Sequence, residues 1–310
     1  MVANLLIFIV ALFLVVRGAT LATKYSAKVA ERFNISRYAI GFIVVAFISI
    51  LPETVISISS ALKGIPEFGL GTLFGSNVAD LTLIFAIMTI VAGRRLKVES
   101  KMLKNVKYYP FLVMLPIIFG LNGHYSRIEG IALMAAGLFF YYQIFKAGTG
   151  PSKAYHAAHG KFKDSIILLL AMVILLVGAH FTVNSAAEIA DALKVSPVLI
   201  GMLVVGLGTT LPELFYSLKA IRKREDGLAI GDILGTVMAD ATIVVGVIAC
   251  ISPFFFPAKI IYVAGMFMVI AAFFLLRLMK TGKTLTRLEG FLLLAFWLVY
   301  AITEFLIGRS

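Results

Sequence analysis

Long apolar stretches separated by short polar segments run through the whole chain. Hydrophobic residues make up 61% of its 310 residues and charged residues 14%, whereas a soluble domain has about 45–50% apolar and about 25% charged residues. Such a chain cannot cover itself with a polar surface, which excludes a soluble enzyme, a secreted disulfide scaffold and a disordered protein. Because about 20 apolar residues form a helix that crosses a bilayer, we predict an all-α membrane protein with ten transmembrane helices. The expected spans are roughly 3–30, 37–60, 70–92, 108–122, 128–146, 164–190, 197–219, 228–252, 257–279 and 286–307.

Lysine and arginine are distributed unequally between the loops of this pattern. The loops after the first, third, fifth, seventh and ninth spans hold 23 of the 28 basic residues, and the others are Lys63, Arg127, Lys194, Lys259 and Arg309. Since basic residues collect in cytoplasmic loops, we expect both termini outside. The net charge of +12 is then a topology signal rather than a nucleic-acid-binding surface. We expect a multi-pass protein of the cell membrane, specifically a prokaryotic plasma membrane.

The two halves of the chain repeat each other at a single offset of 160 residues. Polar residues match as well as apolar ones, so general apolar similarity does not explain the repeat. The matched segments include Gly18-Ala19 with Gly178-Ala179, Leu51-Pro52-Glu53 with Leu211-Pro212-Glu213, Gly75 with Gly235, and Ala79-Asp80 with Ala239-Asp240.

This repeat predicts the organisation of the chain. We expect a first five-helix repeat over 1–147, a polar cytoplasmic linker over 148–163, and a second five-helix repeat over 164–310. Because each repeat has an odd number of spans, the second repeat must cross the membrane in the opposite orientation to the first. Inverted repeats are typical of secondary transporters, whose substrate site lies near the midplane where the repeats meet.

Four carboxylates lie well inside the expected spans: Glu53, Asp80, Glu213 and Asp240. An acidic side chain at the bilayer centre costs about 2.5 kcal/mol or more, and these spans have no lysine or arginine at a comparable depth. We expect bound cations, protons or mutual contacts to compensate them. The alternative is a set of protonated carboxyl groups that form hydrogen bonds between helices.

Two further acids, Glu129 and Glu289, lie at the ends of spans beside Arg127 and Arg287. We expect these neighbours to form local ion pairs without a functional role.

The residues around the four deep acids suit a hard cation. Each glutamate follows Leu-Pro, and a proline breaks a helix and frees backbone carbonyl groups inside the protein. The run 206–213 combines flexible backbone, two hydroxyl groups and a carboxylate. Ser76 and Thr236 precede Asp80 and Asp240 by four residues, which places each pair on one helix face. Such an all-oxygen ligand set suits Ca²⁺.

These motifs resemble the cation/Ca²⁺ antiporter superfamily and, within it, the prokaryotic sodium/calcium exchangers. The resemblance centres on 41–86 and 201–246, and the second of these segments carries the full motif, Gly-Thr-Thr-Leu-Pro-Glu at 208–213 with Gly235-Thr236 and Asp240. It implies a ten-helix fold in which spans 2, 3, 7 and 8 surround the ions and spans 1 and 6 slide across them. It also implies a secondary active antiporter, not an enzyme, that exchanges Ca²⁺ for Na⁺ by alternating access.

The resemblance also implies individual ligands at matching positions. The direct Ca²⁺ ligands would be Glu53 and Glu213, assisted by Ser49, Thr209 and the main-chain carbonyl groups of Ala46 and Gly206. The monovalent-ion sites would be completed by Ser76, Thr210, Thr236, Asp80 and Asp240.

The chain departs from the family pattern in its first half. It has Ile48-Ser49-Ile50 where the family has Gly-Thr-Ser, and Asp80 where many sodium/calcium exchangers have asparagine. One ligand hydroxyl is lost and one titratable group is gained, so an H⁺-coupled antiporter for Ca²⁺ or another cation is the alternative. A cation channel would share the buried acids but requires a continuous pore. The expected partners are the transported cations, Ca²⁺ and Na⁺ or H⁺, and the lipid bilayer, with no cofactor.

Overall fold

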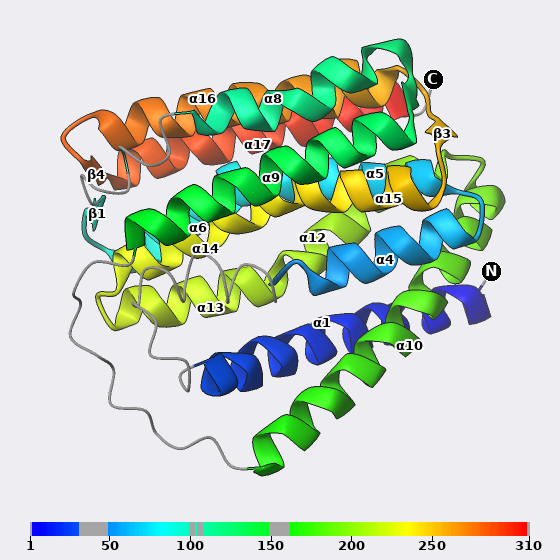
Figure 1. Ribbon diagram of the computed structural model, residues 1–310, viewed down its shortest axis with the longest axis horizontal. Coiled ribbons are helices and arrows are strands. Elements are labelled where there is room, and N and C mark those ends of the chain that lie inside the picture. Colours follow the sequence, from blue (N-terminus) through cyan, green and yellow to red (C-terminus); the bar gives the residue numbers. More distant parts are fainter. Residues whose placement is uncertain (1, 31–48, 99–102, 104–107, 149–161, 309–310) are drawn as a thin grey trace.

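A computed structural model describes residues 2–30, 49–98, 103, 108–148 and 162–308. It shows an all-helical multi-pass membrane protein of about ten helices (Figure 1), as predicted. Among the described residues, seven helices are long and apolar enough to cross a membrane, and the helices Leu51–Leu62 and Tyr109–Asn122 are shorter. The predicted span 37–60 lies partly outside the described residues.

Several spans are built from consecutive helical pieces, with η marking a π- or 3₁₀-helical turn. The first half contains α1 (Val2–Ala30), α4 (Leu51–Leu62), α5 (Pro66–Ala79), η3 (Asp80–Ile84), α6 (Phe85–Ala92), α8 (Tyr109–Phe119), η4 (Gly120–Asn122) and α9 (Arg127–Gly148). The second half contains α10 (Phe162–Leu193), α11 (Pro197–Ile200), η5 (Gly201–Val205), α12 (Gly206–Thr209), α13 (Leu211–Arg222), α14 (Asp226–Ala239), η6 (Asp240–Val244), α15 (Val245–Ile251), η7 (Ile261–Gly265), α16 (Met266–Lys280) and α17 (Arg287–Gly308).

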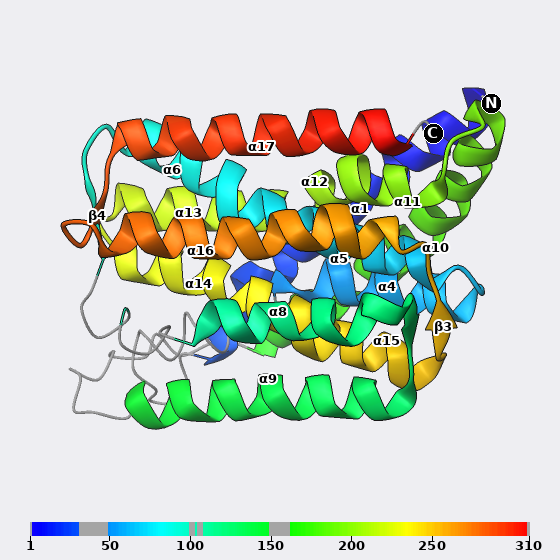
Figure 2. The same ribbon diagram turned by 90° about the horizontal axis from the view of Figure 1, so that it is seen from above.

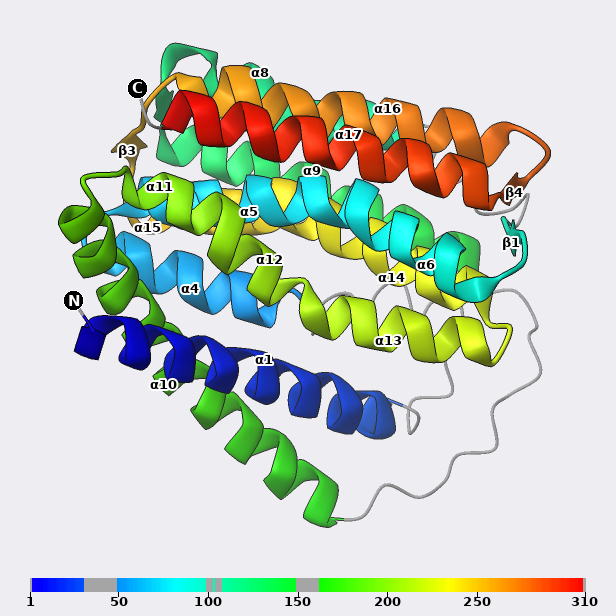
Figure 3. The ribbon, with the colours of Figure 1, turned by 180° about the vertical axis from the view of Figure 1, so that it is seen from behind.

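The helices α1 and α10 pack against each other beside the main bundle, as Figure 3 shows from behind. A Cβ atom on Gly18 would lie 2.9 Å from the backbone nitrogen of Leu175, and one on Gly178 would lie 2.9 Å from that of Val15. The two glycines and their two neighbours are both related by the 160-residue offset. The repeat seen in the sequence is therefore also a repeat of contacts, and glycine permits the close approach of the two backbones.

Two short antiparallel pairs of strands join the halves. β1 (Leu96–Lys97) pairs with β4 (Thr284–Leu285), and β2 (His124–Tyr125) pairs with β3 (Phe254–Phe255). They add four two-residue strands to the expected all-α fold and link the loops at opposite ends of the bundle (Figure 2).

The expectation that Glu129 and Glu289 serve as ion-pair partners of the adjacent arginines was wrong. The Glu129 carboxylate accepts hydrogen bonds from the backbone N–H and the hydroxyl of Ser126, both at 2.7 Å. The Glu289 carboxylate does the same at Thr286, at 2.7 and 2.8 Å. Both are capping boxes, in which a side chain satisfies an N–H group that the helix start leaves free.

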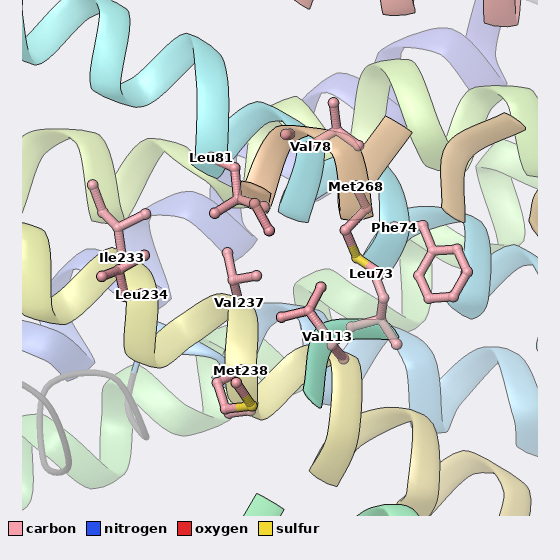
Figure 4. Close-up of a cluster of buried hydrophobic side chains, with 14 of the residues drawn as sticks. Leu73, Phe74, Val78, Leu81, Val113, Ile233, Leu234, Val237, Met238 and Met268 are labelled. Atoms are coloured by element: carbon pink, nitrogen blue, oxygen red, sulfur yellow. The ribbon is translucent and has the colours of Figure 1, made fainter. Parts of the chain in front are cut away.

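The largest apolar core lies between α5, η3, α8, α14 and α16. Figure 4 shows Leu73, Phe74, Val78 and Leu81 facing Val113, Val237, Met238 and Met268. Side chains from both halves interdigitate there, and each helix contacts the π-helical turn that follows the other, α5 with η6 and α14 with η3. This packing positions the acids that follow directly at the C-terminal ends of these two helices.

Candidate cation site

The helices that carry Glu53 and Glu213 both begin next to a proline. α4 starts at Leu51 and α13 at Leu211, and the preceding residues, Ile50 and Thr210, have nearly equal backbone angles (φ −72° and −77°, ψ −4° and −7°). Proline has no N–H group to donate to the preceding turn, so each span restarts as a new helix. Each glutamate therefore lies in the first turn of a helix, where the positive end of the helix dipole favours negative charge.

Asp80 and Asp240 each begin a π-helical turn. η3 covers Asp80–Ile84 and η6 covers Asp240–Val244, and the two turns are related by the same 160-residue offset. Such π-turns are rare and are frequently found at functional sites. All four deep acids therefore lie where a span departs from regular α-helix.

The four deep acids are fully or almost fully buried. Glu53 is 1% exposed, and Asp80, Glu213 and Asp240 are 0% exposed. Neither carboxylate oxygen of any of the four has a hydrogen-bond partner in the described part of the chain. A buried charge without a partner is strongly unfavourable, so these oxygens require cations or protons.

The candidate hydroxyl ligands are buried next to these acids. The hydroxyls of Ser76, Thr209 and Thr210 donate to main-chain oxygens of Leu73, Gly206 and Leu207, each at 3.0 Å. A hydroxyl that donates one hydrogen bond still has lone pairs for a cation. The hydroxyl of Thr236 has no partner among the described residues. Ala46 lies outside the described residues.

The charges of the four carboxylates interact, but the carboxylates do not surround a single metal position. If they are ionised, Glu53 and Asp80 would repel the charges of Glu213 and Asp240. No three Asp, Glu, His or Cys side chains in the described ranges converge on one metal position. A cation held here would therefore take further ligands from hydroxyl and main-chain oxygens, as Ca²⁺ with its six to eight oxygen ligands can do.

Glycine brings the two halves into contact at this level. A Cβ atom on Gly75 would clash with the main-chain oxygen of Met202 in η5, and one on Gly206 would lie 3.0 Å from the backbone nitrogen of Ser76. The backbones of α5 and of the broken span η5–α12 thus touch directly. The candidate ligands Ser76 and Gly206 belong to this contact.

A fifth deep acid, Asp232 on α14, was not predicted. It is 0% exposed, and its carboxylate accepts a hydrogen bond of 3.3 Å from the hydroxyl of Ser49. Ser49 is one of the Ca²⁺ ligands that the family resemblance implied. Asp232 falls near the start of the expected span 228–252. Its sequence signal was its position in an otherwise apolar stretch.

The match to known proteins covers almost the whole chain. The model of the sodium/calcium exchanger protein family matches residues 3–146 and 164–306. The chain belongs to this family. It is thus a multi-pass membrane transporter that binds cations, an antiporter rather than an enzyme, as the sequence motifs predicted.

Individual proteins resemble the chain over at least 94% of its length. The membrane protein MJ0091 of Methanocaldococcus jannaschii is 30% identical over 94% of this chain and 95% of that protein. The sodium/calcium exchanger MaX1 of Methanosarcina acetivorans is 23% identical over 98% of this chain and 99% of that one. A structure of the sodium-calcium exchanger NCX_Mj soaked with 100 mM Na⁺ and 10 mM Sr²⁺ has a TM-score of 0.72 at 25% identity and covers 96% of this chain and 97% of its own.

Proposed function

We propose that the chain exchanges Ca²⁺ for Na⁺ across the membrane by alternating access. The observation that carries the proposal is the set of eight buried carboxylate oxygens, on Glu53, Asp80, Glu213 and Asp240, that have no hydrogen-bond partner among the described residues. Glu53 and Glu213 would bind Ca²⁺ with help from Thr209, Ala46 and Gly206, whereas the hydroxyl of Ser49, a Ca²⁺ ligand in the sequence-based expectation, donates to Asp232. Ser76, Thr210, Thr236, Asp80 and Asp240 would complete the monovalent-ion sites. The family match and the likeness to NCX_Mj support the choice of ions.

The decisive experiment is Ca²⁺ uptake by the purified protein in proteoliposomes, with Na⁺ and pH gradients imposed separately. An outward Na⁺ gradient at equal pH is expected to drive Ca²⁺ uptake. Uptake driven only by the pH gradient would show that the coupling ion is H⁺ and not Na⁺. Ca²⁺ flux that needs no counter-ion gradient and no exchange partner would indicate a channel.

We further propose that residues 1–147 and 164–310 are inverted repeats, that 148–163 is a cytoplasmic linker, and that both termini lie outside. The start of α1 and the end of α17 lie at one end of the bundle in Figures 1 and 2. The α4–α5 and α8–α9 connections lie at that same end, where the sequence has few basic residues. The α13–α14 connection and the β1–β4 pair, with basic residues around them, lie at the other end.

Surface labelling tests this orientation. In a variant with Cys250 replaced by alanine, which removes the one native cysteine, a Ser310→Cys substitution is expected to react with a membrane-impermeant maleimide in intact cells. A Ser152→Cys substitution in the linker is expected to react only after the membrane is opened. Labelling of Ser152→Cys in intact cells would contradict the topology. The linker residues 149–161 lie outside the described residues, so this prediction depends on the charge distribution.

One observation favours H⁺ coupling as a second candidate function. With Asp80, the four deep carboxylates carry a formal charge of −4 if all are ionised, and Ca²⁺ neutralises only two of these charges. Since uncompensated buried charge is unfavourable by several kcal/mol, an aspartate would hold a proton or a second cation while Ca²⁺ is bound.

An Asp80→Asn variant tests this proton role. Protons compete with cations for carboxylates, so we expect Ca²⁺ flux through the native protein to rise with pH. The variant has one titratable group fewer, so its flux should still occur but rise less steeply. The measurement is initial Ca²⁺ flux from acidic to mildly alkaline pH at fixed Na⁺. Identical pH profiles would show that Asp80 takes no part in proton coupling. Complete loss of flux in the variant would indicate that Asp80 is a direct Ca²⁺ ligand.

A further inference from the structure

Asp232 lies between the end of the bundle and the central acids. It is six residues after Asp226 and eight residues before Asp240 on the same continuous helical span. At about 1.5 Å per residue, it is about 9 Å from the first and about 12 Å from the second along the axis. Asp226 marks the bundle end, where its carboxylate binds the guanidinium of Arg94 at 2.6 Å. In the proposed orientation, this end faces the cytoplasm.

The surroundings of Asp232 leave half of its carboxylate without a partner. Its Oδ1 atom accepts one hydrogen bond, from the Ser49 hydroxyl at 3.3 Å, and its Oδ2 atom has none among the described residues although it is fully buried. If it is ionised, Asp232 would repel the charges of the central acids Asp80 and Glu213. The negative charge of Asp232 is therefore compensated by no neighbour in the described structure.

The repeat shows that the fold does not require a charge at this place. The residue that corresponds to Asp232 in the first half is Thr72, which is also fully buried. Its hydroxyl donates to the main-chain oxygen of Phe68 at 3.0 Å, so it is neutral and satisfied. The two halves differ here in charge while they agree at all four central acids. This asymmetry points to a role that only the second half has.

We propose that Asp232 and Ser49 form a separate binding site for a monovalent cation of the size of Na⁺, between the central acids and the cytoplasm. One carboxylate balances one positive charge, and the Asp232 Oδ2 and Ser49 Oγ atoms are hard oxygen ligands of the kind that Na⁺ requires. Ca²⁺ would need more oxygen ligands and more charge than this pair offers. The cytoplasmic placement rests on the proposed function and topology, whereas the cation site itself does not. A cation held here would reduce the repulsion on Asp80 and Glu213. It would also occupy an intermediate position between the cytoplasm and these acids.

Equilibrium binding of radioactive Na⁺ to the purified protein tests this site without requiring transport. The Asp232→Asn variant keeps the shape of the side chain and an oxygen that can accept from Ser49, but it removes the charge. We expect the number of Na⁺ ions bound per protein to fall by about one, while Ca²⁺ binding measured in parallel stays within about twofold of the native value. The matched control is Thr72→Val at the corresponding place of the first half, which should bind Na⁺ like the native protein.

The possible outcomes separate the site from the proposed function. Unchanged Na⁺ stoichiometry and affinity in Asp232→Asn would overturn the site, and so would a simultaneous loss of Ca²⁺ binding, which would place Asp232 in the central site. If Asp232→Asn does not fold, Ser49→Ala decides: Na⁺ binding weakened severalfold supports the site, and unchanged binding overturns it. A native protein that binds Na⁺ but not Ca²⁺ would refute the exchange function and still permit the same comparison.

Discussion

Replacement of either Glu53 or Glu213 by glutamine is expected to abolish Ca²⁺ transport and to leave the protein folded. Glutamine keeps the size of the side chain but carries no charge, and a divalent site depends on charged oxygen ligands. Both carboxylates are buried, and neither has a hydrogen-bond partner among the described residues that the substitution would break. The loss should therefore arise from cation binding and not from packing. Because the two residues occupy corresponding places in the repeat, we expect equal severity.

The measurement is Na⁺-driven Ca²⁺ uptake into proteoliposomes, with gel filtration and thermal unfolding as checks of the fold. Glu67→Gln provides the matched control, because Glu67 also lies in the first turn of a helix, α5, but is partly exposed. Its uptake should equal that of the native protein. Near-normal uptake by Glu53→Gln or Glu213→Gln would exclude that glutamate as an essential Ca²⁺ ligand.

A Gly75→Ala substitution is expected to destabilise the protein and to reduce transport strongly, although it adds only one methyl group. The new Cβ atom would clash with the main-chain oxygen of Met202 and would lie 2.7 Å from its Cα atom. Backbone atoms cannot rotate away as a side chain can, so α5 and η5 must separate. Overpacking of this kind typically costs about 1–3 kcal/mol. The separation would also move Ser76, the next residue, away from the second half.

Thermal unfolding in detergent and Ca²⁺ uptake measure this effect, and Gly265→Ala is the control. A Cβ atom on Gly265 would also be too close to a neighbour, at 2.5 Å, but that neighbour is the terminal Cδ1 atom of Ile117. A flexible side chain can move, so we expect a smaller loss of stability. If Gly75→Ala were as stable and active as Gly265→Ala, direct backbone contact between the halves would not be needed at this point.

Much of the candidate site was predictable because its signals are local in the sequence. The deep acids stand out against apolar neighbours, and a proline marks the start of each new helix at Leu51 and Leu211. The capping box at Ser126 and Glu129 was also visible as a Ser-x-x-Glu pattern, and the ion-pair interpretation overlooked it. Asp232 was missed for a different reason, since its distance from the membrane surface depends on where α14 begins and on which helices cover it.

Patterns in the sequence were enough to predict that this chain spans a membrane, that its two halves correspond at an offset of 160 residues, and that it resembles the exchangers. Hydropathy, charge and motif are properties of individual residues and of short segments, so they can be added along the chain. The tertiary structure alone decided that Asp80 and Asp240 begin π-turns, that Gly75 touches the backbone of Met202, and that Ser49 binds Asp232 rather than pointing at an unpaired glutamate. These features depend on which helices come within contact of each other, and that is settled only when apolar faces and glycines from both halves pack together.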